Sequence, residues 1–243
     1  MRPRLLDLFC GAGGCSVGYH RAGFDVVGVD LHPQPNYPFD FLQIDALRFL
    51  QEEPFRSWDF DAIHASPPCQ AFTQMSARWR GKGGPTDDHP NLIPETRRLL
   101  DATGLPYVIE NVVGAKDHMR TDLMLHGGMF GLGVHRPRRF ECNWLVMGTE
   151  GPRVPFPVGV YGTKPDGRTT YRYRNAGNYV VGQPGSAKKS LIRAAKSIEE
   201  AREVMGIDWM DWPEIKEAIP PAYTEYIGHQ LMAHIAHSRR QTA

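Results

Sequence analysis

The side chain in this sequence best suited to covalent chemistry is the thiol of Cys69. It follows Pro67 and Pro68, which come directly after a short apolar run, residues 60–65. Because proline cannot donate to a strand ladder, this run should be a buried strand that stops before Pro67. Cys69 is therefore expected just beyond the carboxyl end of a strand, where open α/β sheets bind ligands. A thiol placed there can act as a nucleophile when its surroundings activate it. A small buried hydrophobic residue is the alternative interpretation.

An acid and two arginines have the types and positions to assist such a nucleophile. Glu110 follows another apolar run, residues 105–109, so it should lie on the same sheet edge as Cys69. A raised pKa there would let Glu110 serve as an acid or hydrogen-bond donor, whereas a solvated loop acid is the alternative. Arg136 and Arg138 alternate just ahead of a further strand, so in extended chain both side chains point to one face. The alternative for this pair is an ordinary surface position at the start of a strand.

A second group of residues has the layout of a nucleotide-type site. A strand over residues 4–9 leads into the turn 10–14, which contains three glycines, and then into a helix over 16–22. The next strand, residues 24–30, ends in Asp30. Glycines let a ligand approach the backbone, the helix N-terminus faces it, and the acid accepts from ribose hydroxyls. The glycine spacing is not GxGxxG, which favours a mononucleoside ligand such as S-adenosylmethionine over a dinucleotide.

The elements that must position these groups alternate between strands and helices, which predicts an α/β fold. Asp45 either accepts from an adenine amino group or caps a helix over residues 46–50. A helix over 92–102 and a strand over 140–147 complete the pattern. Residues 70–90 are polar and rich in glycine and arginine, and beside a candidate nucleophile they are expected to form a mobile basic lid.

Length and charge limit the possible classes of protein. At 243 residues, one α/β domain with a small insert is expected, and the net charge of +1 alone does not indicate an anionic partner. Residues 148–197, however, hold nine lysines and arginines and two acids, which indicates a local surface for something anionic. The four cysteines form no CxxC pair and no disulfide framework, no metal-ligand set is predicted, and no apolar run reaches signal or membrane length. A soluble cytoplasmic protein is expected.

Four pieces of the sequence, in order, resemble the cytosine-C5 DNA methyltransferases. They are the cofactor motif Asp7–Gly14, the nucleophile motif Pro67–Gln70, the acid motif Glu110–Val112 and the paired-arginine motif Arg136–Arg138. The resemblance covers about residues 4–147 and 199–236. It implies an α/β, Rossmann-like S-adenosylmethionine-dependent methyltransferase fold, with a mostly parallel sheet flanked by helices and a small target-recognition insert. The implied division is a catalytic and cofactor-binding core over residues 1–147, a basic target-recognition region over 148–198, and a C-terminal part over 199–243 that packs back onto the core.

The resemblance also implies an activity and the residues for it. The implied activity is methyl transfer from S-adenosylmethionine to C5 of a flipped-out cytosine in double-stranded DNA, through a Cys69–C6 adduct. The implied protein is a monomer in the cytoplasm of a bacterium or a phage-infected host, of the restriction-modification type. The implied catalytic residues are Cys69, Glu110, Arg136 and Arg138, with Arg136 orienting the Cys69 loop. The implied cofactor contacts are Phe9, Cys10, Gly11, Ala12, Gly13, Gly14, Asp30, Leu31, Asp45, Ala46 and Pro68. The implied substrate contacts are Ser66, Pro67, Gln70, Asn111, Arg172, Arg174, Lys188 and Lys189.

The chain departs from the family pattern at several cofactor positions. Leu31 stands where the family has a bulky residue that stacks on adenine, and Lys216 and Glu217 replace the closing Gly-Asn pair. Two other classes of protein stay open. One is an RNA (tRNA) cytosine-5 methyltransferase built on the same motifs, and the other is a non-catalytic DNA-binding protein that has kept the fold.

Overall fold

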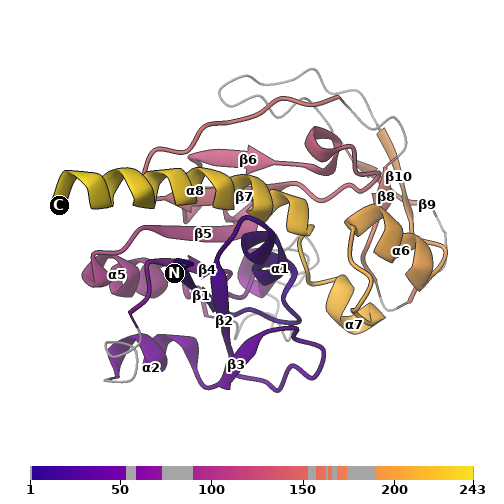
Figure 1. Ribbon diagram of the computed structural model, residues 1–243. Helices are drawn as coiled ribbons and strands as arrows, with labels where there is room; N and C mark the ends of the chain where they lie inside the picture. Colours follow the sequence, from indigo (N-terminus) through magenta and orange to yellow (C-terminus); the bar gives the residue numbers. More distant parts are fainter. Residues whose placement is uncertain are drawn as a thin grey trace.

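A twisted seven-stranded sheet forms the centre of the computed structural model, which describes residues 2–52, 59–72, 90–152, 157–162, 164–165, 169–173 and 190–242. The strand order is β3-β2-β1-β4-β5-β7-β6 (Figure 1). The strands are β1 (Arg4–Leu8), β2 (Asp25–Asp30), β3 (Asp40–Gln43), β4 (Ala62–Ala65), β5 (Tyr107–Val112), β6 (Leu123–Leu125) and β7 (Arg138–Cys142).

Strands β1 to β5 pair in parallel, and only β7 is antiparallel to its two neighbours, β5 and β6. The predicted α/β, mostly parallel fold is therefore confirmed. From β1 the chain builds the sheet outward through β2 and β3, and then returns to the other side of β1 with β4 and β5. The strand order thus reverses between β1 and β4, and ligands of open α/β sheets bind at the carboxyl ends on either side of such a switch point.

Helices cover both faces of the sheet. On one face α1 (Gly14–Arg21) and the long α8 (Pro221–Thr242) bury one apolar cluster, and on the other α2 (Ala46–Gln51) and α5 (Ile93–Thr103) bury a second (Figure 1). Alternate strand residues supply the two clusters, since successive side chains of a strand point to opposite faces. Among the described residues, none of the helices combines the length and the apolar character needed to cross a bilayer.

Helix α8 packs closely along α1 and brings the C-terminal part of the chain back to the first strand. A side chain at Gly18 would place its Cβ 2.1 Å from Thr224 Oγ1 and 2.2 Å from the Pro221 carbonyl, so only glycine permits this approach. The Thr224 hydroxyl donates to the Cys15 carbonyl at 2.8 Å. The helix that follows the glycine turn is therefore held in place by the C-terminal helix.

Strand β7 differs from the strand expected over residues 140–147. It begins two residues earlier and ends at Cys142, because Asn143 leaves the ladder and caps the neighbouring strand instead. The Asn143 amide accepts from the Tyr107 N–H at 2.7 Å and donates to the Leu105 carbonyl at 2.9 Å. Beyond it the side chains still alternate between buried and exposed, but they pack toward α8 rather than toward another strand.

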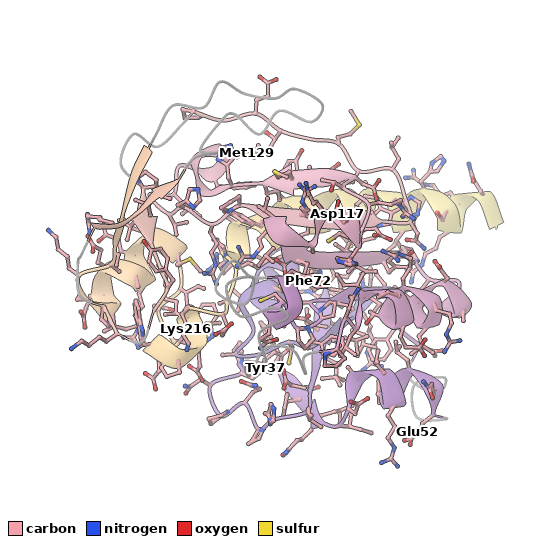
Figure 2. The ribbon with its side chains drawn as sticks, turned by 180° about the vertical axis from the view of Figure 1, so that it is seen from behind. Tyr37, Glu52, Phe72, Asp117, Met129 and Lys216 are labelled. Carbon is pink, nitrogen blue, oxygen red and sulfur yellow. The ribbon has the colours of Figure 1, made fainter. Side chains whose placement is uncertain are left out.

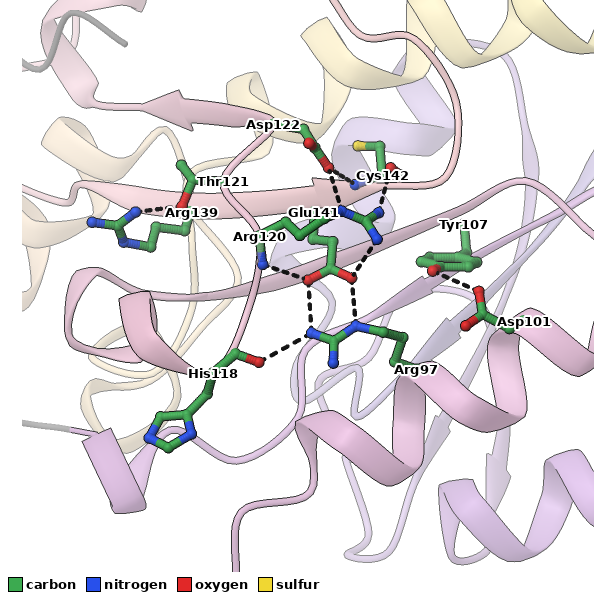
Figure 3. A network of polar contacts seen from close by, with 10 residues as sticks. All are labelled: Arg97, Asp101, Tyr107, His118, Arg120, Thr121, Asp122, Arg139, Glu141 and Cys142. Atoms are coloured by element: carbon green, nitrogen blue, oxygen red, sulfur yellow. Dashed lines mark hydrogen bonds and ion pairs between the residues drawn. The ribbon is translucent and has the colours of Figure 1, made fainter. Parts of the chain in front are cut away.

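A buried carboxylate fastens α5 to β7 (Figure 3). Glu141 is 0% exposed and accepts from Arg97 Nε at 2.6 Å and Arg97 Nη2 at 2.8 Å. The backbone N–H of Arg120 donates to the same carboxylate at 2.8 Å. A buried carboxylate is tolerated only with such partners, and these fix the helix that precedes the strand of Glu110.

The described part of residues 148–198 contains a small second sheet, of order β8-β10-β9. Its strands are β8 (Val158–Gly159), β9 (Thr169–Tyr173) and β10 (Ser190–Ala194). A third apolar cluster joins residues of this segment to α6 (Ile198–Met205) and α7 (Trp212–Ile215). The core of the small sheet therefore crosses the boundary that the sequence suggested at residue 198.

Candidate active site

The glycine turn between β1 and α1 lies at the switch point of the sheet. Phe9 and Gly13 have positive φ angles, of 58° and 85°, and Gly13 is the residue directly before α1. A Cβ at Gly13 would lie 2.9 Å from Pro38 and 3.1 Å from Tyr37, so glycine is required there. The Trp209 indole N–H donates to the Ala12 carbonyl at 2.8 Å. The turn is thus fixed from two sides before any ligand binds.

The carboxylate of Asp30 is held against the glycine turn by backbone N–H groups. One carboxylate oxygen accepts from the Gly11 N–H at 3.0 Å and the other from the His32 N–H at 2.9 Å. Each oxygen keeps a second lone pair, which a ribose hydroxyl can use. Leu31 is 57% exposed and offers an apolar surface next to the acid.

These residues fit a mononucleoside cofactor. A Cβ at Gly11 would meet nothing within 4 Å, so the backbone is open to a ligand at the point where Asp30 binds it. Asp45 is the N-cap of α2, accepting from the Arg48 N–H at 2.8 Å, and Ile44 N–H bonds to the Asp30 carbonyl. The cap interpretation of Asp45 is therefore confirmed, and the same position keeps it near the acid.

The remaining predicted cofactor residues differ in exposure. Cys10, Ala12 and Ala46 are buried, so in this structure their side chains belong to the core, and a ligand would meet the backbone. Pro68 is exposed.

The nucleophile segment leaves the sheet directly beside the end of β1. The Ser66 N–H donates to the Leu8 carbonyl at 3.1 Å, which extends the parallel pairing by one residue. The Asn111 amide donates to the Pro67 carbonyl at 2.9 Å and accepts from the Val112 N–H at 2.9 Å. Asn111 is 1% exposed, and both ends of its amide are used inside the protein. In this structure the Asn111 side chain holds the loop that carries Cys69, and the substrate contact predicted for it stays a prediction.

Glu110 and Arg138 form an ion pair beside that loop. Arg138 Nε lies 2.9 Å from Glu110 Oε1, with the side chains 12% and 9% exposed, although the contact is not aligned as a hydrogen bond. Glu110 lies inside β5 rather than at its end, because the antiparallel β7 continues the pairing to Val112. Burial raises the pKa of Glu110, whereas Arg138 and then the Ser66 hydroxyl lower it. Such a carboxyl group is suited to hydrogen-bonding a heterocycle in either protonation state.

Cys69 is the half-buried member of four free cysteines, the others being buried. Burial raises the pKa of its thiol, and Arg138 opposes this effect while Glu110 reinforces it. The thiol of the free protein is therefore protonated near neutral pH, and the arginine is the principal group that favours the thiolate. Burial raises the pKa of Cys10, Cys15 and Cys142 as well, so Cys69 is the described thiol placed for reaction.

Arg136 is buried and binds backbone carbonyls of other segments, and the orienting role predicted for it toward the Cys69 loop stays a prediction. Its guanidinium donates to the carbonyls of Ala218 at 2.9 Å, Val160 at 3.0 Å and Lys216 at 2.5 Å. Burial, and then Arg138, lower the pKa of Arg136 to about 9, which leaves it charged at neutral pH. Arg136 thus joins the segment Lys216–Ala218 to the small sheet, and its influence on Cys69 is electrostatic.

The loop after β2 also reaches the C-terminal segments beside the candidate site, a contact that the sequence did not indicate. The Asn36 amide donates to both carboxylate oxygens of Glu214 in α7, at 3.0 and 2.9 Å. Figure 2 shows Tyr37 and Lys216 on neighbouring parts of the molecule, where this loop meets the C-terminal segments. Glu217, at the position of the family's Gly-Asn pair, is close enough to Cys69 to raise the pKa of its thiol.

Several predicted substrate contacts are not tested by the described structure. Arg174, Lys188 and Lys189 lie outside the described residues, and Arg172 lies in β9. Gln70 begins a short 3-10 helix (Gln70–Phe72) and is exposed, while Pro67 is buried. Contacts between these residues and a substrate stay predictions.

A glycine turn, an acid at the end of β2, and a cysteine, a glutamate and an arginine at the next strands give a methyltransferase-type fold with a candidate nucleophile at its switch point. A family model described as C-5 cytosine-specific DNA methylase matches residues 3–126, and the chain belongs to that family.

Two curated relatives show how far the likeness extends. Type II methyltransferase M.AquIA of Picosynechococcus sp. is 30% identical over 128 residues, which cover 47% of this chain and 50% of the relative. A tRNA (cytosine(38)-C(5))-methyltransferase of Spodoptera frugiperda is 30% identical over 186 residues, which cover 70% of this chain and 48% of the relative. The match thus spans about half the length of each of these two relatives.

Solved structures with the same fold match nearly the whole chain. A putative DNA modification methyltransferase encoded within a prophage (E. coli) has a TM-score of 0.58 and 16% identity, with 95% of this chain and 99% of that chain covered. The Spodoptera frugiperda DNMT2 mutant has a TM-score of 0.59 and 14% identity, with the same coverage. At these identities the likeness establishes the fold.

Proposed function

We propose that the chain transfers a methyl group from S-adenosylmethionine to C5 of a cytosine in double-stranded DNA. The observation that carries this proposal is the grouping of Cys69, Glu110 and Arg138 at the carboxyl edge of the sheet, next to the open glycine turn. A thiol with an adjacent cation and a buried carboxyl group is the set that addition to a pyrimidine ring requires.

Cys69 supplies the covalent step. C5 of cytosine is a weak nucleophile because reaction there breaks the aromaticity of the ring. When the Cys69 thiolate forms a bond to C6, the electron pair of the C5–C6 double bond becomes available at C5, which then forms a bond to the methyl group. Loss of the proton from C5 and cleavage of the Cys69–C6 bond restore the ring and return the thiolate.

Glu110 and Arg138 stabilise the charge that this addition creates. The negative charge moves toward N3 and O2 of the ring as the sulfur bonds to C6. Glu110 would hydrogen-bond the N3 and amino edge, and Arg138 would support O2 while it favours the thiolate form of Cys69. Because both groups are already held by β5 and β7, little reorganisation is needed.

The cofactor residues have a separate task. S-adenosylmethionine supplies an electrophilic methyl group when it is bound. Asp30 would accept from the ribose hydroxyls, the open backbone at Gly11 would face the ligand, and exposed Leu31 would contact the adenine ring. Asp45 would accept from the adenine amino group, as predicted from the sequence.

The DNA would have to present its target base outside the duplex. Stacking hides C6, so the cytosine must be flipped into the site. The basic block within residues 148–198 would contact phosphates and base edges. The setting that fits this substrate is the cytoplasm of a bacterium or of a phage-infected host.

A tRNA cytosine is the second candidate substrate, because one observation favours it. The match to the Spodoptera frugiperda tRNA methyltransferase extends over 70% of this chain, against 47% for M.AquIA. The longer match runs through part of the region expected to recognise the target.

The test is methylation of duplex DNA and of tRNA side by side, followed by mapping of the modified cytosines. Methylated C5 positions in DNA, and none in tRNA, are expected; the reverse result would transfer the proposal to RNA. A duplex carrying 5-fluorocytosine at the target should trap the protein covalently, since fluorine cannot leave C5 as a proton does. Peptide mapping should find the adduct on Cys69.

The variant Cys69→Ser should abolish turnover and leave the affinities for cofactor and DNA nearly unchanged, because a hydroxyl ionises far less than a thiol near neutral pH. Robust methylation by this variant, or an adduct on Cys10, Cys15 or Cys142, would overturn the mechanism. Calorimetric titration of S-adenosylmethionine separates an enzyme from a non-catalytic DNA-binding protein, which would show no binding.

A further inference from the structure

A stripe of polar side chains crosses the face of the sheet that α1 and α8 cover. His64 on β4 lies opposite Asp7 on β1 and Val108 on β5 in the parallel registers. Because strand side chains alternate, Ser66 and Glu110 lie two residues further along on the same face. The stripe therefore runs from the core to the carboxyl group of the candidate active site.

Hydrogen bonds connect this stripe to α1. His64 Nδ1 lies 2.9 Å from the Tyr19 hydroxyl, and His64 Nε2 lies 2.9 Å from Ser66 Oγ. His64 and Tyr19 are both 0% exposed. Ser66 Oγ is also 3.7 Å from Cys15 Sγ, and the Ser66 hydroxyl lies close enough to Glu110 to lower the pKa of its carboxyl group. Ser66 thus has three polar neighbours, which matches the one donor and two lone pairs of a hydroxyl.

The direction of each hydrogen bond follows from the protonation of its members. Burial lowers the pKa of His64 to about 3, so the ring is neutral and has one donor and one acceptor nitrogen. Burial raises the pKa of Tyr19 well above its usual range, so the phenol keeps its proton. If His64 donated from Nδ1, the Tyr19 proton would need another acceptor, and the described residues show no further side-chain hydrogen bond of Tyr19. Tyr19 therefore donates to Nδ1, and Nε2 carries the proton.

We propose that Tyr19, His64 and Ser66 form a directed hydrogen-bond chain that orients the Ser66 hydroxyl so that it donates to Glu110, which favours the carboxylate form of Glu110. In this arrangement His64 Nε2–H would donate to one lone pair of Ser66 Oγ and the Cys15 thiol, 3.7 Å away, to the other, which leaves the Ser66 proton for Glu110. His64 and Tyr19 are positioning residues, since neither touches the substrate side. This hydrogen-bond chain adds a positioning role to the proposed function, and it rests on that function for the role of Glu110.

Bound metal is the competing explanation for this corner of the fold. Ligand atoms of Asp7, Cys15 and His64 lie within 4.8 Å of one another. A cation would need a ring nitrogen of His64, and both nitrogens have hydrogen-bond partners, while Asp7 Oδ2 accepts from Ser16. The hydrogen-bond chain gives both ring nitrogens of His64 a partner without an ion.

The groups that act on Glu110 come from every element packed around it. The ionisable groups that interact with Glu110 on the sheet and α1 are Asp7 of β1 and Cys15 and Tyr19 of α1. The others are Cys69 after β4, Tyr223 of α8, Arg138 of β7, and Arg136 just before β7. Of these, Arg138 and Arg136 favour the carboxylate, as Ser66 does. Loss of the chain should therefore shift the titration of Glu110 upward while both arginines remain.

The first test is the pH profile of single-turnover methylation. In Ser66→Ala the limb that reports Glu110 should move to higher pH by about one unit, the size expected for a lost hydrogen bond to a charged group. Tyr19→Phe, which removes one buried oxygen, should move the same limb in the same direction by less. Ser66→Thr keeps a hydroxyl and should restore the profile. Tyr107→Phe is the matched control, because its hydroxyl donates to Asp101 on the other face of the sheet. An unmoved limb in Ser66→Ala would overturn the proposal.

The second test does not depend on activity. In protein labelled with ¹⁵N-histidine, with the His64→Asn spectrum as the assignment, the His64 ring should be the neutral Nε2–H tautomer between about pH 6 and pH 9. Tyr19→Phe should convert it to a mixture of tautomers. An Nδ1–H tautomer or an imidazolium in the unmodified protein would contradict the chain. If the protein methylated no nucleic acid, the proposed function would fail, but this spectrum would still show whether the hydrogen-bond chain of Tyr19, His64 and Ser66 exists.

Discussion

At the scale of single residues, Arg138 is the cation that acts on both Cys69 and Glu110. Its guanidinium pairs with Glu110 and is the main influence that lowers the pKa of the Cys69 thiol against the effect of burial. The thiol pKa is nevertheless raised above its usual value, so the reactive thiolate increases as pH rises toward that pKa. The arginine therefore controls how much thiolate is present at neutral pH.

Replacing Arg138 with Met should slow alkylation of Cys69 by iodoacetamide at pH 8 and move its pH profile upward, because removal of the cation disfavours the thiolate. A change of roughly tenfold in rate corresponds to about one pKa unit. Arg139→Met is the control, since that guanidinium donates to the Val113 carbonyl and to Thr121. Cys69→Ser measures labelling of the buried cysteines. Equal rates in the Arg138 and Arg139 variants would contradict this account.

Asp30 is the residue on which cofactor affinity should depend. The variant Asp30→Ala removes an acceptor for the ribose hydroxyls and the anchor of the Gly11 N–H, so affinity should fall by roughly 1–3 kcal/mol. Calorimetric titration with S-adenosylmethionine measures this, and Asp45→Ala, which removes a helix cap, separates the adenine contact from the ribose contact. An unchanged dissociation constant for Asp30→Ala would disprove its assignment.

The sequence predicted where the candidate catalytic residues lie better than it predicted what holds them. Cys69 and Glu110 follow apolar runs, and that local pattern was enough to place both at one edge of the sheet. Arg136 donates to carbonyls 24 to 82 residues away, and backbone acceptors leave no mark in the sequence. His64 gave no signal either, because a single histidine in an apolar run is ordinarily a core residue.

At the scale of elements, the same limit explains the error over residues 140–147. The alternation of side chains predicted a strand, and buried Trp144 and Val146 do alternate with exposed Leu145 and Met147. The ladder nevertheless stops at Cys142, since Asn143 uses its amide to cap β5. Met147 is then bound through its backbone by Gln230 of α8. Alternation reports burial, whereas pairing depends on which backbone lies alongside.

Removal of Arg97 tests the energetic role of the buried Glu141 at this scale (Figure 3). Arg97→Met removes the main partner of the Glu141 carboxylate, which is 0% exposed, and leaves the Arg120 N–H as a donor. This loss should lower the free energy of unfolding by about 3 kcal/mol. Adding Glu141→Leu should recover most of this loss, because the unpaired charge is then gone. Denaturant unfolding of the two single variants and the double variant measures the coupling. Additive losses would show that the pair does not act as a unit.

At the scale of the whole molecule, charge is separated along the chain although the total is near neutral. The small sheet shares an apolar cluster with α6 and α7, and Arg136 joins its Val160 carbonyl to the closing segment beside the glycine turn. A ligand contacting residues 148–198 would therefore be connected to the candidate active site through packed structure. Phosphate contacts by this region would make DNA affinity depend steeply on salt.

Salt dependence is the measurement that tests this arrangement. The logarithm of the DNA association constant should fall linearly with the logarithm of salt concentration, by about 0.9 for each phosphate contact. Lys188→Ala with Lys189→Ala should reduce that slope by up to about 1.8 and leave the recognised sequence unchanged, because phosphates carry no base identity. Arg48→Ala with Arg98→Ala is the matched control. It removes the same charge from exposed positions on α2 and α5, where the side chains pair with Glu52 and Glu95. Equal slopes for both double variants would mean that net charge, rather than the basic region, attracts the DNA.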